Sequence, residues 1–171
     1  MMFHSNLILI GMPAVGKSTV GRLIAERLVC PFIDTDTDIE AMEGRRLSRI
    51  IQEAGVDGFL RIEEAHLLSI QAEGAVISTG GSAVYGKRGM AHLKRLGIVV
   101  YLRADMAALA RHMDDPDKRG VVKKPGQSLR SLFEEREALY LRYADRVVTR
   151  SADEGPETTA DSVLSACCSK P

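Results

Sequence analysis

The sequence has no excess of charge of either sign and no long apolar run. Its 23 Lys and Arg residues balance 23 Asp and Glu residues, which gives a formal net charge of zero. A chain without a basic excess is a poor candidate for binding nucleic acid or an anionic membrane surface. No apolar run approaches the roughly 18 residues that a membrane-spanning helix needs. Because Met1–Asn6 also lacks the basic residues of a secretory signal, we expect a cytoplasmic protein with neither nucleic acid nor membrane as a partner.

Cysteine is scarce as well. Cys30, Cys167 and Cys168 form an odd set without Cys-x-x-Cys spacing, which predicts neither a disulfide framework nor a zinc site. The remaining composition is that of an ordinary globular protein, with 171 residues, 45% of them hydrophobic and 27% charged. This length suits one domain and is sufficient for a core without disulfides. We therefore expect a single domain over residues 1–171 that is a monomer.

Short apolar segments alternate with amphipathic segments along the chain. The apolar segments predict strands at Asn6–Gly11, Phe32–Ile33, Ala75–Ser78, Gly97–Leu102 and Arg146–Thr149. Helical periodicity predicts helices at Ser18–Leu28, Asp38–Ala54, Gly58–Gln71, Gly86–Arg95, Ala104–His112, Leu129–Ala144 and Thr158–Ala166. Residues Asp114–Ser128 contain two prolines, two glycines and many charges, which favours a mobile loop. This alternation predicts an α/β fold with a parallel sheet, whose carboxyl edge binds ligands.

A glycine-rich segment follows the first predicted strand. Gly11-Met12-Pro13-Ala14-Val15-Gly16-Lys17-Ser18 matches the pattern G-x-x-x-x-G-K-[ST]. Glycines let successive backbone N–H groups point at phosphate oxygens, and the next helix directs its positive end at the same anion. The lysine supplies a charge to the β- and γ-phosphates, and the Ser18 hydroxyl is a ligand for Mg²⁺. A chance glycine turn does not explain its place between a strand and a helix, so residues 11–18 with Thr19 predict a site for a nucleoside triphosphate and Mg²⁺.

Further motifs follow in order along the chain. They are Asp34-Thr35-Asp36, Phe59–Glu63, Thr79-Gly80-Gly81, Arg119 and Arg136–Tyr140. Together with the glycine-rich loop, they resemble the shikimate kinase family in order and spacing from about Asn6 to Thr149. The resemblance implies a three-layer α/β/α P-loop kinase fold with a five-stranded parallel sheet, substrate-binding helices at about 36–73 and a lid at about 114–128. It also implies transfer of the γ-phosphate of ATP to a hydroxyl of shikimate or of a related small alcohol that carries a carboxylate.

The same resemblance implies roles for individual residues. Lys17 is similar to the lysine that contacts the phosphates, and Asp34 to the aspartate that holds Mg²⁺ with Ser18. Asp36 resembles the aspartate that binds the acceptor hydroxyls and takes a proton, and Arg119 the lid arginine that meets the transferring group. The implied acceptor contacts are Glu63, Gly80, Gly81 and Arg136, the last one to a carboxylate. Arg111 or His112 lies where the family stacks a basic side chain on adenine.

Simpler interpretations exist for several of these side chains. Asp34 and Asp36 stand before a predicted helix, where a carboxylate caps free N–H groups. Arg119 lies on a charged loop, where arginines are usually solvated. Arg136 lies within Glu134–Glu137, where it has the spacing of a surface ion pair, although its phase relative to Leu132 and Leu139 favours the apolar face.

The chain departs from the family pattern at two positions. The family carries Phe-Arg-x-x-Glu, whereas Phe59-Leu60-Arg61-Ile62-Glu63 has leucine at the arginine position, and Ser82 replaces the third glycine. Losing a bidentate arginine partner for a carboxylate costs on the order of 2–3 kcal/mol of binding. Either Arg61 substitutes through a local distortion of the helix, or the acceptor is another compound, such as homoserine. A nucleotide-binding regulatory protein without catalysis is the alternative from another class.

Overall fold

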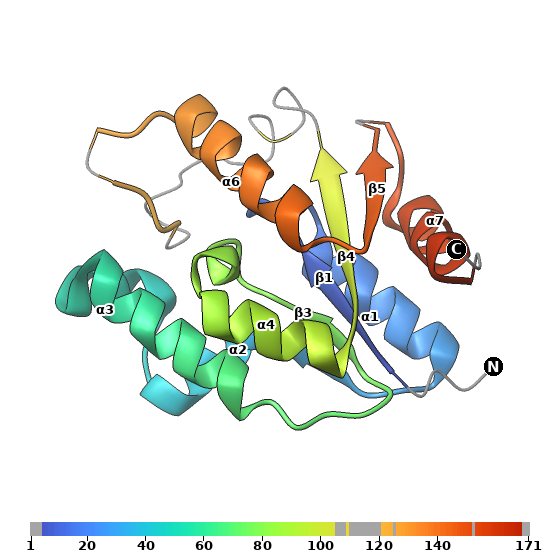
Figure 1. Cartoon of the computed structure of the whole chain (residues 1–171), viewed down its shortest axis with the longest axis horizontal. Helices are drawn as coiled ribbons and strands as arrows, with labels where there is room; N and C mark the ends of the chain where they lie inside the picture. The colour runs from blue at the N-terminus through green and yellow to red at the C-terminus, as the bar shows by residue number, and fades with distance from the viewer. Residues whose placement is uncertain (1–4, 105–108, 110–120, 125, 152, 169–171) are drawn as a thin grey trace.

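Five parallel strands form one sheet (Figure 1). The structure is a computed structural model that describes residues 5–104, 109, 121–124, 126–151 and 153–168. The strands are β1 (Asn6–Ile10), β2 (Phe32–Asp34), β3 (Val76–Ser78), β4 (Gly97–Ala104) and β5 (Arg146–Arg150). Their order is β2-β3-β1-β4-β5, and all four neighbouring pairs are parallel. The expected five-stranded parallel sheet is confirmed, with each strand within two residues of its predicted end.

Helices cover both faces of the sheet. They are α1 (Lys17–Leu28), α2 (Thr35–Glu43), α3 (Leu47–Ser69), α4 (Lys87–Leu96), α6 (Leu129–Tyr143) and α7 (Pro156–Cys168), with a 3₁₀ turn η1 (Ala83–Tyr85). Helices α1 and α7 pack against each other, while α4 packs against α3 and β4. Right-handed crossovers place these two groups on opposite faces. Among the described residues, no helix combines the length and the apolar character that crossing a bilayer requires.

The core has two parts. The main part is built on the central strands, where Leu7–Ile10 and Val99–Leu102 are buried on both sides. A smaller cluster lies beneath α2 and α3 and contains Ile39, Leu47, Ile50, Phe59 and Val122. Val122 comes from the segment before α6, so this cluster holds that segment against the α2–α3 pair.

The prediction of one helix over Asp38–Ala54 is wrong. Helix α2 ends at Glu43 because Gly44 adopts a left-handed conformation with φ 66°, which glycine adopts without steric cost. Arg46 is extended at the start of α3, and the Glu40 side chain accepts a hydrogen bond of 2.9 Å from the Leu47 N–H. The break expected between Ala54 and Gly58 is present, because Gly55 has non-helical angles of φ 71° and ψ 173° and divides α3 into two parts. Of the predicted helix 104–112 and the predicted lid, residues 105–108, 110–120 and 125 lie outside the described residues.

Candidate active site

The glycine-rich loop wraps tightly between β1 and α1. Gly11 has φ 148°, and a methyl group at its Cα would lie 2.5 Å from the Leu102 carbonyl oxygen. Gly16 has φ 99° and precedes α1 directly. Ala14 also adopts a left-handed conformation, with φ 64°, which costs an alanine of order 1 kcal/mol. This backbone path brings the amino end of α1, with its free N–H groups, to the mouth of the loop.

Lys17 lies inside this loop and is almost fully buried. Its Nζ donates hydrogen bonds of 2.9 Å to the carbonyl oxygens of Gly11 and Met12. Burial lowers the pKa of Lys17 to about 8, against the opposing effects of the Asp36 and Asp34 carboxylates. The loop therefore holds a desolvated cationic group, and an anion bound at the loop would stabilise the charged form of Lys17.

A cavity of about 560 Å³ opens beside the loop. Its lining includes most of the predicted nucleotide-binding residues, namely Pro13, Ala14, Gly16, Lys17, Ser18 and Thr19. The side chains of Met12 and Val15 are buried in the core instead, so only their backbone groups are available to a ligand. Asp36, Gly81, Ser82 and Arg136 line the same cavity. The structure thus brings the predicted phosphate loop and the predicted acceptor residues together.

Two carboxyl groups approach Gly80, next to this cavity. A methyl group at the Gly80 Cα would lie 2.4 Å from Glu63 Oε1 and 2.6 Å from Asp36 Oδ1. Burial raises the pKa of Asp36 to about 6, while the positive charge of Lys17 acts in the opposite direction. Burial and the charge of Asp36 raise the pKa of Glu63 to about 8, with the Ser82 side chain acting in the opposite direction. Of the two, Asp36 therefore loses its proton at the lower pH.

Arg136 is fully buried, so the interpretation as a surface ion pair is wrong. Its Nη2 donates to the carbonyl oxygen of Val122, and its guanidinium carbon lies 5.4 Å from the centre of the Tyr85 ring. Its Nη1 is buried without a hydrogen-bond partner among the described residues. Such an unpaired donor on a cation is costly unless a ligand satisfies it.

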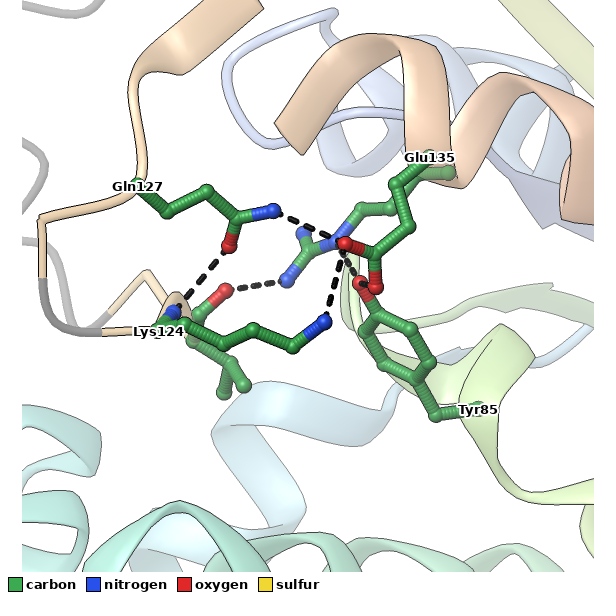
Figure 2. Close-up of polar contacts among 6 residues, drawn as sticks. Tyr85, Lys124, Gln127 and Glu135 are labelled. Carbon is green, nitrogen blue, oxygen red and sulfur yellow. Dashed lines mark hydrogen bonds and ion pairs between the residues drawn. The ribbon is translucent and has the colours of Figure 1, made fainter. Parts of the chain in front are cut away.

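A polar network fixes the surroundings of Arg136 (Figure 2). The Tyr85 hydroxyl donates a hydrogen bond of 2.9 Å to Glu135 Oε1. Lys124 Nζ and Gln127 Nε2 lie 3.3 Å and 2.8 Å from Glu135 Oε2. The network therefore ties the segment before α6 to α6 and orients the Tyr85 ring beneath Arg136.

Ser18 and Asp34, the predicted magnesium ligands, lie at the same edge of the sheet. The Ser18 Oγ is 3.3 Å from the Ser78 Oγ at the end of β3. Asp34 ends β2 and caps α2, because its Oδ1 accepts a hydrogen bond of 3.3 Å from the Thr37 N–H. The capping interpretation is thus confirmed for Asp34, whereas Asp36 lies in the first turn of α2. The part of the chain that the structure describes contains no group of three or more His, Cys, Asp or Glu side chains arranged for a metal.

Comparisons with known proteins show the family to which this chain belongs. The model of the shikimate kinase family matches residues 13–168. A shikimate kinase of Thiobacillus denitrificans is 36% identical over 148 residues, which cover 85% of this chain and 81% of that protein. The chain belongs to the shikimate kinase family. It is therefore an ATP-dependent phosphotransferase of that family, as the sequence predicts.

Solved structures of shikimate kinases have the same fold. Shikimate kinase from Acinetobacter baumannii in complex with shikimate matches with a TM-score of 0.85 and 30% identity, covering 94% of this chain and 90% of that one. Shikimate kinase from Aquifex aeolicus matches with a TM-score of 0.80 and 30% identity, covering 95% of each chain. Threonine synthase-like 1 of Homo sapiens is 37% identical over 163 residues, which are 94% of this chain but 22% of that protein.

The two departures from the shikimate kinase pattern lie in different surroundings. Ser82 is buried and lines the main cavity. Leu60 lines a neighbouring groove of about 350 Å³, which shares Val122 with the main cavity. Arg61 is exposed and does not line the main cavity. The structure therefore gives no support to the idea that Arg61 takes the place of the missing arginine.

Three predicted residues of this shikimate kinase family member cannot be compared with the structure. Two other residues at the site, Arg46 and Arg150, were not predicted from the sequence. Arg111, His112 and Arg119 lie outside the described residues. Arg46 lines the main cavity and was not predicted; the helix-breaking Gly44 was the signal that its segment is a turn. Arg150, also missed, donates a hydrogen bond of 3.0 Å from Nη1 to the Val15 carbonyl oxygen and so supports the phosphate loop.

Proposed function

We propose that this protein transfers the γ-phosphate of ATP to a hydroxyl group of a small acceptor that carries a carboxylate, with shikimate as the first acceptor to test. One observation carries the proposal. The phosphate loop, Asp36 and a buried Arg136, whose Nη1 has no partner among the described residues, all line one cavity of about 560 Å³. The solved relative from Acinetobacter baumannii is described as a complex with shikimate, which supports this choice of first acceptor.

The donor side is the loop around Lys17. The backbone N–H groups at the start of α1 bind phosphate oxygens, and Lys17 exchanges its contacts with Gly11 and Met12 for the phosphates. Ser18 and Asp34 have the oxygen donors that Mg²⁺ prefers, and the charge of Asp34 acts on Lys17, so they fit a magnesium site here. The ion would supply charge neutralisation to the phosphates when bound.

The acceptor side is formed by Asp36 and Arg136. Arg136 directs Nη1 to the acceptor carboxylate, which satisfies a donor that is otherwise unpaired. Asp36 has the lower pKa of the two neighbouring carboxyl groups and lines the cavity, so it orients the acceptor hydroxyl and receives its proton. Phosphoryl transfer needs little else beyond alignment and neutralisation of charge. Helices α2 and α3 form the substrate subdomain in this proposal.

Homoserine is the second acceptor that the residues favour. Leu60 removes one arginine from the family pattern, and Ser82 adds a hydroxyl at the cavity. An acceptor with one carboxylate and a compensating ammonium group suits this charge, with Asp36 as partner of the ammonium. Relatives named threonine synthase-like 1 align over 94% of this chain, so this kinase-like sequence also occurs in proteins that are not named for shikimate.

The experiment is a comparison of acceptors. ADP release from ATP and Mg²⁺ is measured with shikimate, with homoserine and without acceptor, and the product is identified by its mass. We expect phosphorylation of at least one of the two acceptors. A low KM for shikimate would remove homoserine as the native acceptor.

A lack of transfer to either acceptor, together with tight ATP binding, would contradict the proposed function. It would favour the regulatory, non-catalytic alternative.

A further inference from the structure

Two of the three nitrogen atoms of the Arg136 guanidinium already have partners in the protein. Arg136 uses Nη2 for the Val122 carbonyl oxygen, and its Nε lies 3.5 Å from the Tyr85 hydroxyl. Nη1 has no partner among the described residues, so its N–H groups face the ligand alone unless a second cation joins them. Lys17 donates hydrogen bonds to the carbonyl oxygens of Gly11 and Met12, and in the proposed function it binds the phosphates of ATP instead of the acceptor.

The shikimate kinase family has an arginine at the position of Leu60 in α3, and no cationic side chain takes its place there. Leu60 is apolar and lines the neighbouring groove, and Arg61 is exposed outside the cavity lining. A second cation must therefore come from another element. In the part of the chain that the structure describes, the cavity lining has three cationic side chains, Lys17, Arg46 and Arg136.

Arg46 occupies the turn between α2 and α3. It stands in an extended conformation at the start of α3, followed by Leu47 and Ser48, which also line the cavity. Its side chain makes no hydrogen bond or ion pair with any residue in the described ranges 5–104, 109, 121–124, 126–151 and 153–168. The adjacent Arg45, in contrast, pairs with Glu43 and Glu53.

The charges around Arg46 leave it available for a ligand. Glu40, the nearest acidic member of the lining along the chain, accepts the Leu47 N–H with Oε1 and forms no ion pair with Arg46. The amino end of α3 adds a partial positive charge at the same place. An anion in this cavity therefore has Arg46 as well as Arg136 among the cations of the lining.

We propose that Arg46 is the second carboxylate-binding residue of this enzyme, which pairs with the acceptor carboxylate opposite Nη1 of Arg136 and replaces the arginine that Leu60 removes. This inference rests on the proposed function, because it assumes an acceptor with a carboxylate. It makes Arg46 a determinant of acceptor specificity that acts from the α2–α3 turn.

The test is the kinetics of Arg46→Ala with shikimate, homoserine and the methyl ester of each. We expect the KM of the free acid to rise about 10- to 100-fold, with kcat and the KM of ATP changed by less than about threefold. The methyl ester lacks the negative charge of the carboxylate, so the wild type should have a much higher kcat/KM for the acid than for the ester. In Arg46→Ala most of this difference in kcat/KM should be lost. Arg46→Lys should recover part of it.

Arg49→Ala is the matched control. Arg49 is an exposed arginine one turn further along α3, pairs with Glu53 and does not line the cavity. Arg49→Ala should therefore leave the KM of the acceptor and the KM of ATP unchanged. If the wild type phosphorylates an acceptor while Arg46→Ala keeps its KM and its preference for the acid, the inference is wrong and the proposed function stands. If the wild type phosphorylates neither acceptor, both the inference about Arg46 and the proposed function are wrong.

Discussion

Asp36 Oδ1 and Glu63 Oε1 both lie against Gly80, one on α2 and the other on α3. They are no further apart than the sum of their 2.6 Å and 2.4 Å distances to a methyl group placed on Gly80. Two carboxyl groups this close, Glu63 buried and Asp36 partly buried, do not both ionise readily. The pKa of Asp36 is raised to about 6 and that of Glu63 to about 8, so Asp36 is the more acidic group of the pair.

Glu63→Gln tests this separation through stability. The pKa of Glu63 is higher in the folded protein than the ordinary value of 4.5. Its contribution to stability is therefore fully present below about pH 4.5 and is lost as the pH rises to about 8. We expect wild type and variant to unfold with similar free energies near pH 4.5, and the variant to be more stable by on the order of 3 kcal/mol at pH 8.

Urea unfolding across this pH range measures the difference. Glu134→Gln, at an exposed position on α6, is the control and should follow the wild type. A constant difference between Glu63→Gln and wild type across the range would show that Glu63 is ionised throughout.

Gly80→Ala tests the role of the glycine between the two carboxyl groups. The added methyl group would meet both oxygen atoms well inside their contact distances, and both side chains would have to move. We expect a loss of about 1 kcal/mol in stability but a drop of at least about 100-fold in kcat, since a displacement of about 1 Å at a reacting group costs this much. Gly155→Ala, at a position with no atom within 4 Å of the added methyl, should change neither quantity.

Asp36→Asn tests the proposed proton acceptor. We expect ATP affinity to stay within about threefold, because the phosphate loop is unchanged. The turnover should fall by roughly 10²- to 10⁴-fold, the usual effect of a general base. In the wild type, kcat/KM for the acceptor should rise with a midpoint near pH 6, where Asp36 loses its proton, and this rise should be absent from the variant. An unchanged turnover would remove Asp36 from the catalytic group.

The sequence predicts the sheet and the phosphate loop well for a physical reason. Strands buried on both faces are apolar throughout, and a loop that wraps phosphate requires glycine at positions such as Gly11 and Gly16. The burial of Arg136 follows from its phase relative to Leu132 and Leu139. These features are local, so their residues are enough to predict them.

The missed features depend on tertiary contacts. Gly44 ends α2 and turns Arg46 towards the cavity, yet helical periodicity continues across this position and conceals the turn. Leu60, which stands at the arginine position of the family pattern, lines a groove together with Val122, which is more than 60 residues away along the chain. Neither placement follows from the spacing of residues along the chain.

Leu60→Arg tests whether the missing arginine determines the acceptor. The groove of Leu60 shares Val122 with the main cavity, so an arginine at this position lies near Arg136. We expect kcat/KM for shikimate to rise by about tenfold or more, the gain of one charge-assisted hydrogen bond, while homoserine gains less. Leu60→Met, which adds length without charge, is the control. Equal activity of Leu60→Arg and Leu60→Met would show that position 60 does not contact the acceptor.

The most direct test of phosphoryl transfer is a ³¹P nuclear magnetic resonance spectrum of the protein with ATP, Mg²⁺ and each acceptor. The account predicts that the γ-phosphate signal is replaced by that of a phosphate monoester on shikimate or homoserine, and that Lys17→Met, which lacks the loop cation, leaves ATP intact. An unchanged ATP spectrum with wild type, or the appearance of inorganic phosphate alone with both acceptors, would contradict it.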